Sequence, residues 1–397
     1  MIYDYNECQK IFKTFNNTII KEINPIGYTA LEKLPIRCFT LGSGKNSVVV
    51  SASQHSNEVI STTFIIYLMN YLIKNNLEFE DLTIYFIPIL NPEGYLINTS
   101  AIRSKIPKNE SYDKLIKYCY QYYKNYKYDN INLTNFKLHH LMFNDVDYKI
   151  VNPQYNILKD SVGEILSKHP KGSIIDWASN GKGIDLNSNS VNKIVSENEF
   201  NKKRAYNNIR MDIPSPIGYP GDNSNPFFEQ EIEILSLKKL MEELDKKSNL
   251  LGFLNYHSVG GIIFQRPEDN NNMFSVIYNY LLSKFYQEYT TKNNGKYEIV
   301  KDSAGKITSV NDTLRIMYPG NLLIELSPMS GNPIGVFGDP RNFISTIDSN
   351  INSFVYTMKN INRVYKISNS VSQESSSKVE DAYKHVDEIY EDIMLKK

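Results

Sequence analysis

Two runs of consecutive apolar residues, separated by a helical segment, constrain the fold of this chain most. Residues 47–52 read SVVVSA and residues 82–90 read LTIYFIPIL. A strand that is apolar on both faces is typical of the buried interior of a parallel sheet. The segment between them, residues 58–74, has apolar residues at helical spacing. Strand, helix and strand form a βαβ unit, which predicts a largely parallel sheet covered by helices, an α/β fold.

The same patterns extend this prediction along the chain. Further strands are predicted at residues 36–41, 251–256, 261–264 and 321–326, and helices at residues 5–15 and 226–247. The composition changes to Tyr, Lys and Asn at about residues 105–171, which indicates a helical insertion. We therefore expect one domain over residues 1–367, followed at 368–397 by a Ser-rich linker and a C-terminal helix.

Composition excludes several classes of partner and site. Lys and Arg together number 44, as do Asp and Glu, so the formal net charge is zero. A balanced chain lacks the basic footprint of nucleic-acid-binding proteins, and we expect no nucleic acid partner. The three cysteines, Cys8, Cys38 and Cys119, are too few and too scattered for a disulfide framework or a cysteine metal site.

Neither a membrane segment nor an export signal is visible in the sequence. No run reaches the eighteen or so apolar residues of a transmembrane helix. The first residues include two acids, Asp4 and Glu7, and lack the basic start and apolar run of a signal peptide. We therefore expect a cytoplasmic protein without a membrane partner, while its oligomeric state stays open.

Two histidines follow predicted buried strands, at the edge where open α/β sheets place their ligand crevices. His55 comes after the strand at 47–52, and His257 comes after the strand at 251–256. Glu58 follows His55 by three residues at the strand-to-helix turn, so both side chains can reach one ion. A third ligand from a distant strand would complete a catalytic zinc site with an open water position.

Six motifs in order make the chain resemble the zinc carboxypeptidase family, the carboxypeptidase A-like funnelins, over most of residues 10–365. The first is the H-x-x-E turn of His55 and Glu58. The others are N-P-E-G-Y at 91–95, W-A-S-N with G-I-D-L-N-S-N at 177–189, residues 219–231, H-S-V-G at 257–260, and P-G-N-L-L-I-E-L-S-P at 319–328. Asn57 and the last motif are closer to the bacterial branch of the family than to its digestive enzymes.

The resemblance implies a single domain built on a mostly parallel, mixed eight-stranded sheet sandwiched by helices. It also implies one Zn²⁺ per chain, held by His55, Glu58 and His257, with a water in the fourth position. Zinc makes such a water a nucleophile near neutral pH. Glu325 is the candidate general base, because a lone acid in the apolar strand LLIEL is costly to bury without a task.

The substrate-binding residues implied by the family are less complete. Arg103 is the candidate for stabilising the oxyanion, since it is the only arginine between Tyr95 and Trp177; Lys105 and Lys108 are the alternatives. Relatives grip the substrate carboxylate with N-R-N, where this chain has Asn187, Ser188 and Asn189. An arginine from elsewhere would have to replace the missing one, and Tyr297 and Tyr318 are the candidates for a substrate-covering tyrosine; the possible arginines are Arg204, Arg210 and Arg266.

These features predict a zinc-dependent metallopeptidase that hydrolyses an amide bond of a small peptide, with murein-type peptides as one possible substrate. Zinc-bound water would be the nucleophile and Glu325 the general base. Two alternatives stay open. One is an N-acyl amino acid amidohydrolase of the same fold, and the other is a non-catalytic, peptide-binding relative.

Overall fold

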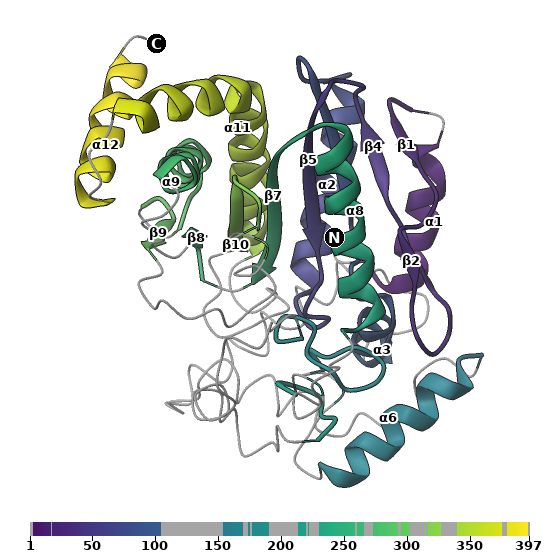
Figure 1. The fold of residues 1–397 in the computed structure, drawn as a ribbon. Helices are drawn as coiled ribbons and strands as arrows, with labels where there is room; N and C mark the ends of the chain where they lie inside the picture. Colours follow the sequence, from purple (N-terminus) through teal and green to yellow (C-terminus); the bar gives the residue numbers. More distant parts are fainter. Residues whose placement is uncertain are drawn as a thin grey trace.

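Eight strands form one mixed sheet in the computed structural model, in the order β1-β4-β6-β5-β7-β10-β8-β9 (Figure 1). The structure describes residues 3–16, 18–104, 154–169, 174, 177–189, 213–219, 221, 230–258, 260–265, 273–292, 295–301, 314, 317–326, 340–374 and 379–395. The sheet strands are β1 (Ile20–Glu22), β4 (Phe39–Leu41), β5 (Asn46–Ala52), β6 (Leu82–Ile87), β7 (Asn249–Ser258), β8 (Ile262–Gln265), β9 (Glu298–Lys301) and β10 (Asn321–Leu326).

The four central strands β6, β5, β7 and β10 run parallel to one another. On one side of them β4 is antiparallel to β6, and β1 is antiparallel to β4. On the other side β8 is antiparallel to β10, while β9 is parallel to β8. Strand β5 lies in the middle, and all of its residues are buried. Val48 and Val50 pack into the larger core cluster, whereas Val49 packs into the smaller one on the opposite face. The predicted mixed α/β sheet is therefore confirmed.

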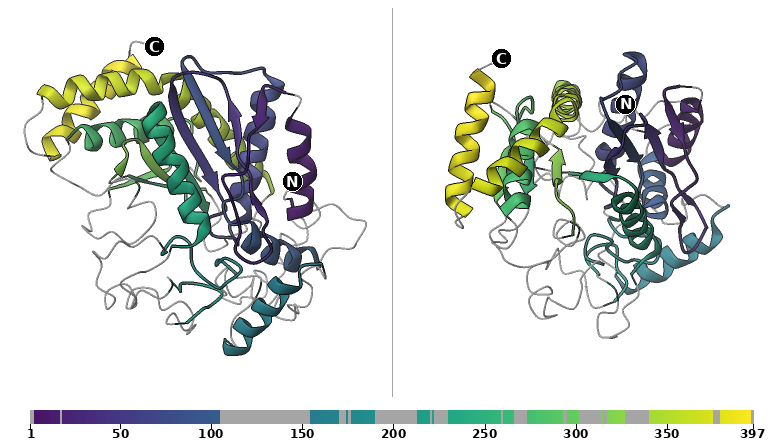
Figure 2. Two further views of the ribbon diagram at one scale, coloured as in Figure 1. Left: turned by 45° about the vertical axis from the view of Figure 1, so that its right-hand side comes forward. Right: turned by 45° about the horizontal axis from the view of Figure 1, so that its top comes forward.

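Helices cover both faces of this sheet. The larger core lies under α1 (Tyr5–Phe15), α2 (Val59–Lys74), α9 (Met273–Gln287) and α11 (Pro340–Glu374), and the smaller core lies under α8 (Ile232–Lys247). The short hairpin β2 (Gly27–Tyr28) and β3 (Pro35–Ile36) packs beside α8. Figure 2 shows α9, α11 and α12 gathered together, away from α1. The remaining described helices are α3 (Pro92–Ser104), α6 (Asn156–Lys168) and α12 (Val379–Leu395).

Several predicted boundaries differ from the observed ones. The strand predicted at 36–41 is split, because Ile36 pairs with Gly27 in the small hairpin whereas Phe39 pairs with Phe86 in the main sheet. Residues 368–374, predicted as linker, continue helix α11. The reason is packing, since Ser368 and Val371 are buried inside that helix. Most of the predicted insertion at 105–171 lies outside the described residues, apart from α6.

None of the helices in the described part of the chain combines the length and the apolar character that crossing a bilayer requires.

Helix α8 carries a buried acid that makes a pH-dependent prediction. Glu233 lies in the first turn of α8, is fully buried, and neither carboxyl oxygen has a hydrogen-bond partner among the described residues. Burial, reinforced by the charges of Glu231 and Glu93, raises the pKa of Glu233 from 4.5 to about 8. The folded protein therefore holds a proton that the unfolded chain releases above pH 4.5. Stability falls as the pH rises through this window and levels off above pH 8.

We expect Glu233→Gln to be more stable than the parent by about 2–4 kcal/mol at pH 8. The parent must protonate the Glu233 carboxyl on folding at a pH above its ordinary pKa, whereas the glutamine amide is already neutral. The difference should shrink toward zero near pH 4.5. Urea unfolding between these pH values measures it, with Glu242→Gln on the exposed face of α8 as the control. A stability difference that does not change with pH would contradict this account of Glu233.

Candidate metal centre

The turn after β5 carries two of the predicted metal ligands. Strand β5 ends at Ala52, and Ser53 adopts the left-handed backbone conformation (φ +50°), which breaks the extended strand. Ser53 is fixed in this conformation by the first turn of α2. Its backbone N–H donates to Ser61 Oγ over 3.0 Å, and its hydroxyl lies 2.7 Å from Thr62 Oγ1. The turn therefore places His55 and Glu58 at the carboxyl end of the central strand.

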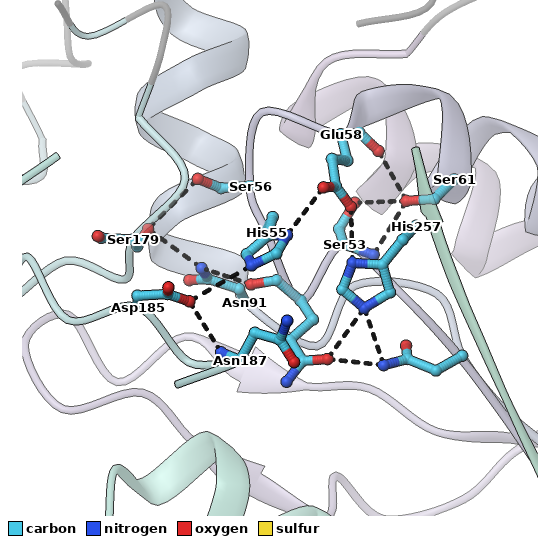
Figure 3. Close-up of polar contacts among 12 residues, drawn as sticks. Ser53, His55, Ser56, Glu58, Ser61, Asn91, Ser179, Asp185, Asn187 and His257 are labelled. Atoms are coloured by element: carbon cyan, nitrogen blue, oxygen red, sulfur yellow. Dashed lines mark hydrogen bonds and ion pairs between the residues drawn. The ribbon is translucent and has the colours of Figure 1, made fainter. Parts of the chain in front are cut away.

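The third predicted ligand comes from the neighbouring strand. Strands β5 and β7 are parallel, and Ala52 is the register partner of Tyr256, so His257 lies beside the turn that follows β5. Glu58 Oε1 is 2.8 Å from His55 Nδ1, and Glu58 Oε2 is 2.9 Å from His257 Nδ1 (Figure 3). The two imidazole rings stand 4.9 Å apart, nearly perpendicular to each other. The three side chains therefore converge through Nδ1, Nδ1 and a carboxylate.

The charges of this cluster favour a cation. Burial alone would lower the pKa of His55, but the carboxylates of Glu58 and Asp185 outweigh it and raise the pKa well above its ordinary value. Burial likewise opposes ionisation of Glu58, but His55 and His257 lower its pKa. The negative charges that stabilise a protonated imidazole also stabilise a bound metal cation.

The donor set fits zinc. One ligand atom from each of His55, Glu58 and His257 lies within 4.8 Å of the others, and no other such group of acids, histidines or cysteines occurs among the described residues. Two histidines and one glutamate form one of the ligand sets found in catalytic zinc sites, where a fourth position is kept for water or substrate. These three side chains would therefore hold one zinc ion.

Each histidine has a partner on its far nitrogen, and the sequence motifs predicted no role for any of these partners. His55 Nε2 is 3.3 Å from Asp185 Oδ1 (Figure 3). His257 Nε2 is 3.1 Å from Gln54 Oε1 and 3.0 Å from Asn255 Nδ2. Partners of this kind orient metal-binding imidazoles. The available signal in the sequence was the polar Asn255 inside the otherwise apolar run LLGFLNY.

Glu325, the predicted general base, lies on the strand next to His257. The two residues are register partners in the parallel pair β7–β10, so their side chains point to the same face of the sheet. Burial and the negative charge of Glu58 raise the pKa of Glu325, and His55 opposes this effect. Glu325 Oε2 is buried and has no hydrogen-bond partner among the described residues. The structure thus brings Glu325 together with the three candidate ligands.

The predicted substrate contacts Asn187 and Ser188 lie next to the metal cluster, on the loop that carries Asp185. Ser188 is fully buried and donates its hydroxyl proton to Asp185 Oδ2 over 2.7 Å. Asn187 donates its backbone N–H to Asp185 Oδ1, and its own Oδ1 is buried without a hydrogen bond to any described residue. Ser188 therefore supports Asp185, while Oδ1 of Asn187 is left for a contact that the described residues do not make.

Arg103 is not brought together with this cluster. It lies in the last turn of α3, where its Nε is 3.7 Å from Asp4 Oδ2 and its Nη1 is 4.0 Å from Glu7 Oε1 at the start of α1. Thus these contacts link two helices and do not support the predicted oxyanion role. The alternatives Lys105 and Lys108 lie outside the described residues.

The two tyrosines proposed to cover the substrate are also elsewhere. Tyr297 is buried and its hydroxyl accepts a hydrogen bond from Asn350 of α11. Tyr318 is buried in the smaller core under α8. The possible replacements for the missing arginine, Arg204, Arg210 and Arg266, fall outside the described part of the chain.

The N-P-E-G-Y motif at residues 91–95 holds two loops beside the site. Asn91 donates from Nδ2 to the backbone oxygen of Ser179 over 3.1 Å and to that of Gln54 over 3.3 Å. Its Oδ1 accepts from the N–H of Gly94. A Cβ on Gly94 would lie 2.3 Å from the Ser179 oxygen, so a side chain does not fit there. The N-P-E-G-Y motif therefore joins the Gln54 turn to the loop that leads to Asp185.

Comparisons with known proteins agree with this architecture. The model of the zinc carboxypeptidase family matches residues 17–374. Carboxypeptidase A from Helicoverpa armigera superposes with a TM-score of 0.55 at 13% identity, covering 92% of this chain and 74% of that chain. Bovine thrombin-activatable fibrinolysis inhibitor, in complex with tick carboxypeptidase inhibitor, gives 0.52 at 14% identity, covering 91% and 98%. A search of curated proteins found no significant match.

Proposed function

The chain belongs to the zinc carboxypeptidase family, and on that premise we propose that it hydrolyses an amide bond of small peptides. The observation that carries the proposal is the convergence of Glu58 with the Nδ1 atoms of His55 and His257, beside Glu325 on the adjacent strand. This constellation provides three ligands for one ion and one further carboxyl on the same face of the sheet. It is the minimum that zinc-assisted amide hydrolysis requires.

Zinc, when bound, lowers the pKa of a water molecule and polarises the scissile carbonyl. The protein residues around the ion supply the rest of the chemistry. Glu325 would take a proton from the attacking water and return it to the departing amine. Its place on strand β10, in register with His257, puts this carboxyl on the face of the sheet where the three ligands converge.

The recognition of the substrate differs from that of a typical carboxypeptidase. A guanidinium would bind a terminal carboxylate through two parallel hydrogen bonds, but position 188 holds a serine whose hydroxyl is engaged by Asp185. We infer that Asn187 alone contributes a polar contact from this loop. If this loop alone binds the terminus, the preference for a free over an amidated carboxyl terminus should be about tenfold or less, which corresponds to roughly one neutral hydrogen bond. A much larger preference would indicate that one of Arg204, Arg210 and Arg266 supplies the missing charge.

The decisive experiment assays the zinc-loaded protein on three substrate classes. These are small peptides with free or amidated termini, murein-type peptides containing a γ-D-glutamyl bond, and N-acyl amino acids. We expect peptide hydrolysis that is lost on chelation and restored by zinc, with little preference for the free carboxylate. Turnover of N-acyl amino acids alone would favour the amidohydrolase. A protein that binds one zinc and turns over none of these substrates would contradict the proposal.

A further inference from the structure

A buried chain of polar side chains connects the central sheet to the far nitrogen of His257. Ser51 donates its hydroxyl proton to Asn255 Oδ1 over 2.7 Å, and Asn255 Nδ2 donates to Gln54 Oε1 over 2.6 Å. Gln54 Oε1 in turn lies 3.1 Å from His257 Nε2. Ser51, Gln54 and Asn255 are fully buried. Buried polar groups in a central sheet are costly unless they serve each other or a site.

The direction of these hydrogen bonds determines which ring nitrogen of His257 carries the proton and which keeps a lone pair for a metal. Asn255 Nδ2 approaches both Gln54 Oε1 and His257 Nε2, but the contact with the glutamine oxygen is the shorter, at 2.6 Å against 3.0 Å. The Gln54 oxygen can accept a second proton, and His257 Nε2 is within reach to donate it. An imidazole protonated at Nε2 keeps the Nδ1 lone pair for a metal. That Nδ1 is the atom that faces Glu58.

From this geometry we propose that Gln54 is a positioning residue for the metal site, whose side-chain oxygen holds the Nε2 proton of His257 and thereby presents Nδ1 to zinc. The proposal rests on the zinc site within the proposed function and not on the reaction catalysed there. Asn255 and Ser51 keep the glutamine oxygen in place.

A neutral side chain suits the position of Gln54 because the surrounding site already holds several carboxyl groups. Glu58, Asp185 and Glu325 already gather three carboxyl groups around two imidazoles. A fourth carboxylate beside His257 would add one more negative charge to this buried group of acids. Gln54 orients the histidine without adding charge, whereas His55 is oriented by the ionisable Asp185.

The test measures zinc affinity by competition with a chromophoric chelator. In Gln54→Met, which removes the acceptor at similar length, we expect zinc affinity to fall about 10- to 100-fold. In Gln54→Glu, which restores an oxygen at the same place, we expect affinity within about threefold of the parent or tighter. Asn350→Leu, which disrupts a buried polar network with Tyr286 and Tyr297 that includes none of the three metal ligands, controls for general loss of stability.

A second measurement does not depend on any variant folding. The ¹⁵N chemical shifts of the zinc-loaded protein report which nitrogen of His257 carries the proton, and we expect Nε2. Protonation at Nδ1 in the zinc-loaded protein would overturn the proposal. So would a Gln54→Met protein that binds zinc as tightly as the parent. Neither result depends on peptide hydrolysis, so the proposed function and this inference can fail separately.

Discussion

Replacement of Glu325 by glutamine should reduce peptide hydrolysis by about a hundredfold to ten-thousandfold while leaving zinc bound. The amide retains the size and polarity of the side chain but cannot take the proton from water, and a positioned general base contributes about 10²–10⁴ in rate. Glu325 is not one of the three converging ligands, so the metal content should stay at one per chain. The measurement is kcat/KM alongside elemental analysis for zinc.

The matched control is Glu298→Gln, an exposed acid on strand β9 of the same sheet. Its activity should equal that of the parent. If Glu325→Gln kept the parental kcat/KM on every substrate that the parent hydrolyses, Glu325 would not be the general base. If the variant lost zinc as well as activity, its side chain would belong to the metal site itself.

Removal of Glu58 should strongly weaken zinc binding and abolish activity at ordinary zinc concentrations. Glu58 contributes the only carboxylate among the three ligands and contacts both histidines, at 2.8 and 2.9 Å. Without it, the two imidazoles also lose the negative charge that favours a cation between them. We expect zinc affinity of Glu58→Ala to fall on the order of a thousandfold, since one protein ligand of three is lost.

Zinc binding by chelator competition and activity on the best peptide measure this effect. Glu243→Ala, an exposed acid on α8, is the control and should bind zinc like the parent. Thermal unfolding with and without added zinc provides an independent readout. The parent should gain stability from zinc, because an ion that binds only the folded state raises its stability. Glu58→Ala should gain little, and a parent-like gain would show that the ion binds elsewhere.

The sequence predicted the centre of the fold better than its edges, for a physical reason. Strands β5 and β10 are buried on both faces, so their apolar runs are unmistakable. The edge strands β1 (Ile20–Glu22) and β9 (Glu298–Lys301) are short, mixed in polarity and defined by pairing with one neighbour, which no local pattern encodes. The division of residues 36–41 between two sheets depends on the same non-local pairing.

The residues of the site likewise divide into those that local sequence patterns predict and those that depend on contacts between distant segments. His55, Glu58 and His257 could be predicted because motif spacing and strand ends placed them together. Gln54 became visible only in the structure, because its contact with Asn255 depends on the register between β5 and β7. Arg103 was chosen as the arginine that follows the N-P-E-G-Y motif in the sequence, and its oxyanion role stays a prediction. The helix α3 carries this side chain away from the motif and toward Asp4 and Glu7.

The left-handed Ser53 determines how the spacing of the metal ligands is set. A positive φ at a residue with a side chain costs on the order of 1–3 kcal/mol, which the contacts with Ser61 and Thr62 offset. The same contacts tie the end of β5 to the start of α2, so the positions of His55 and Glu58 depend on the junction between strand and helix. His257 belongs to the neighbouring strand β7, which is paired with β5 from Asn46 to Ala52. Its distance from the other two ligands therefore depends on the register between these two central strands, and a change in that register would separate one ligand from the other two.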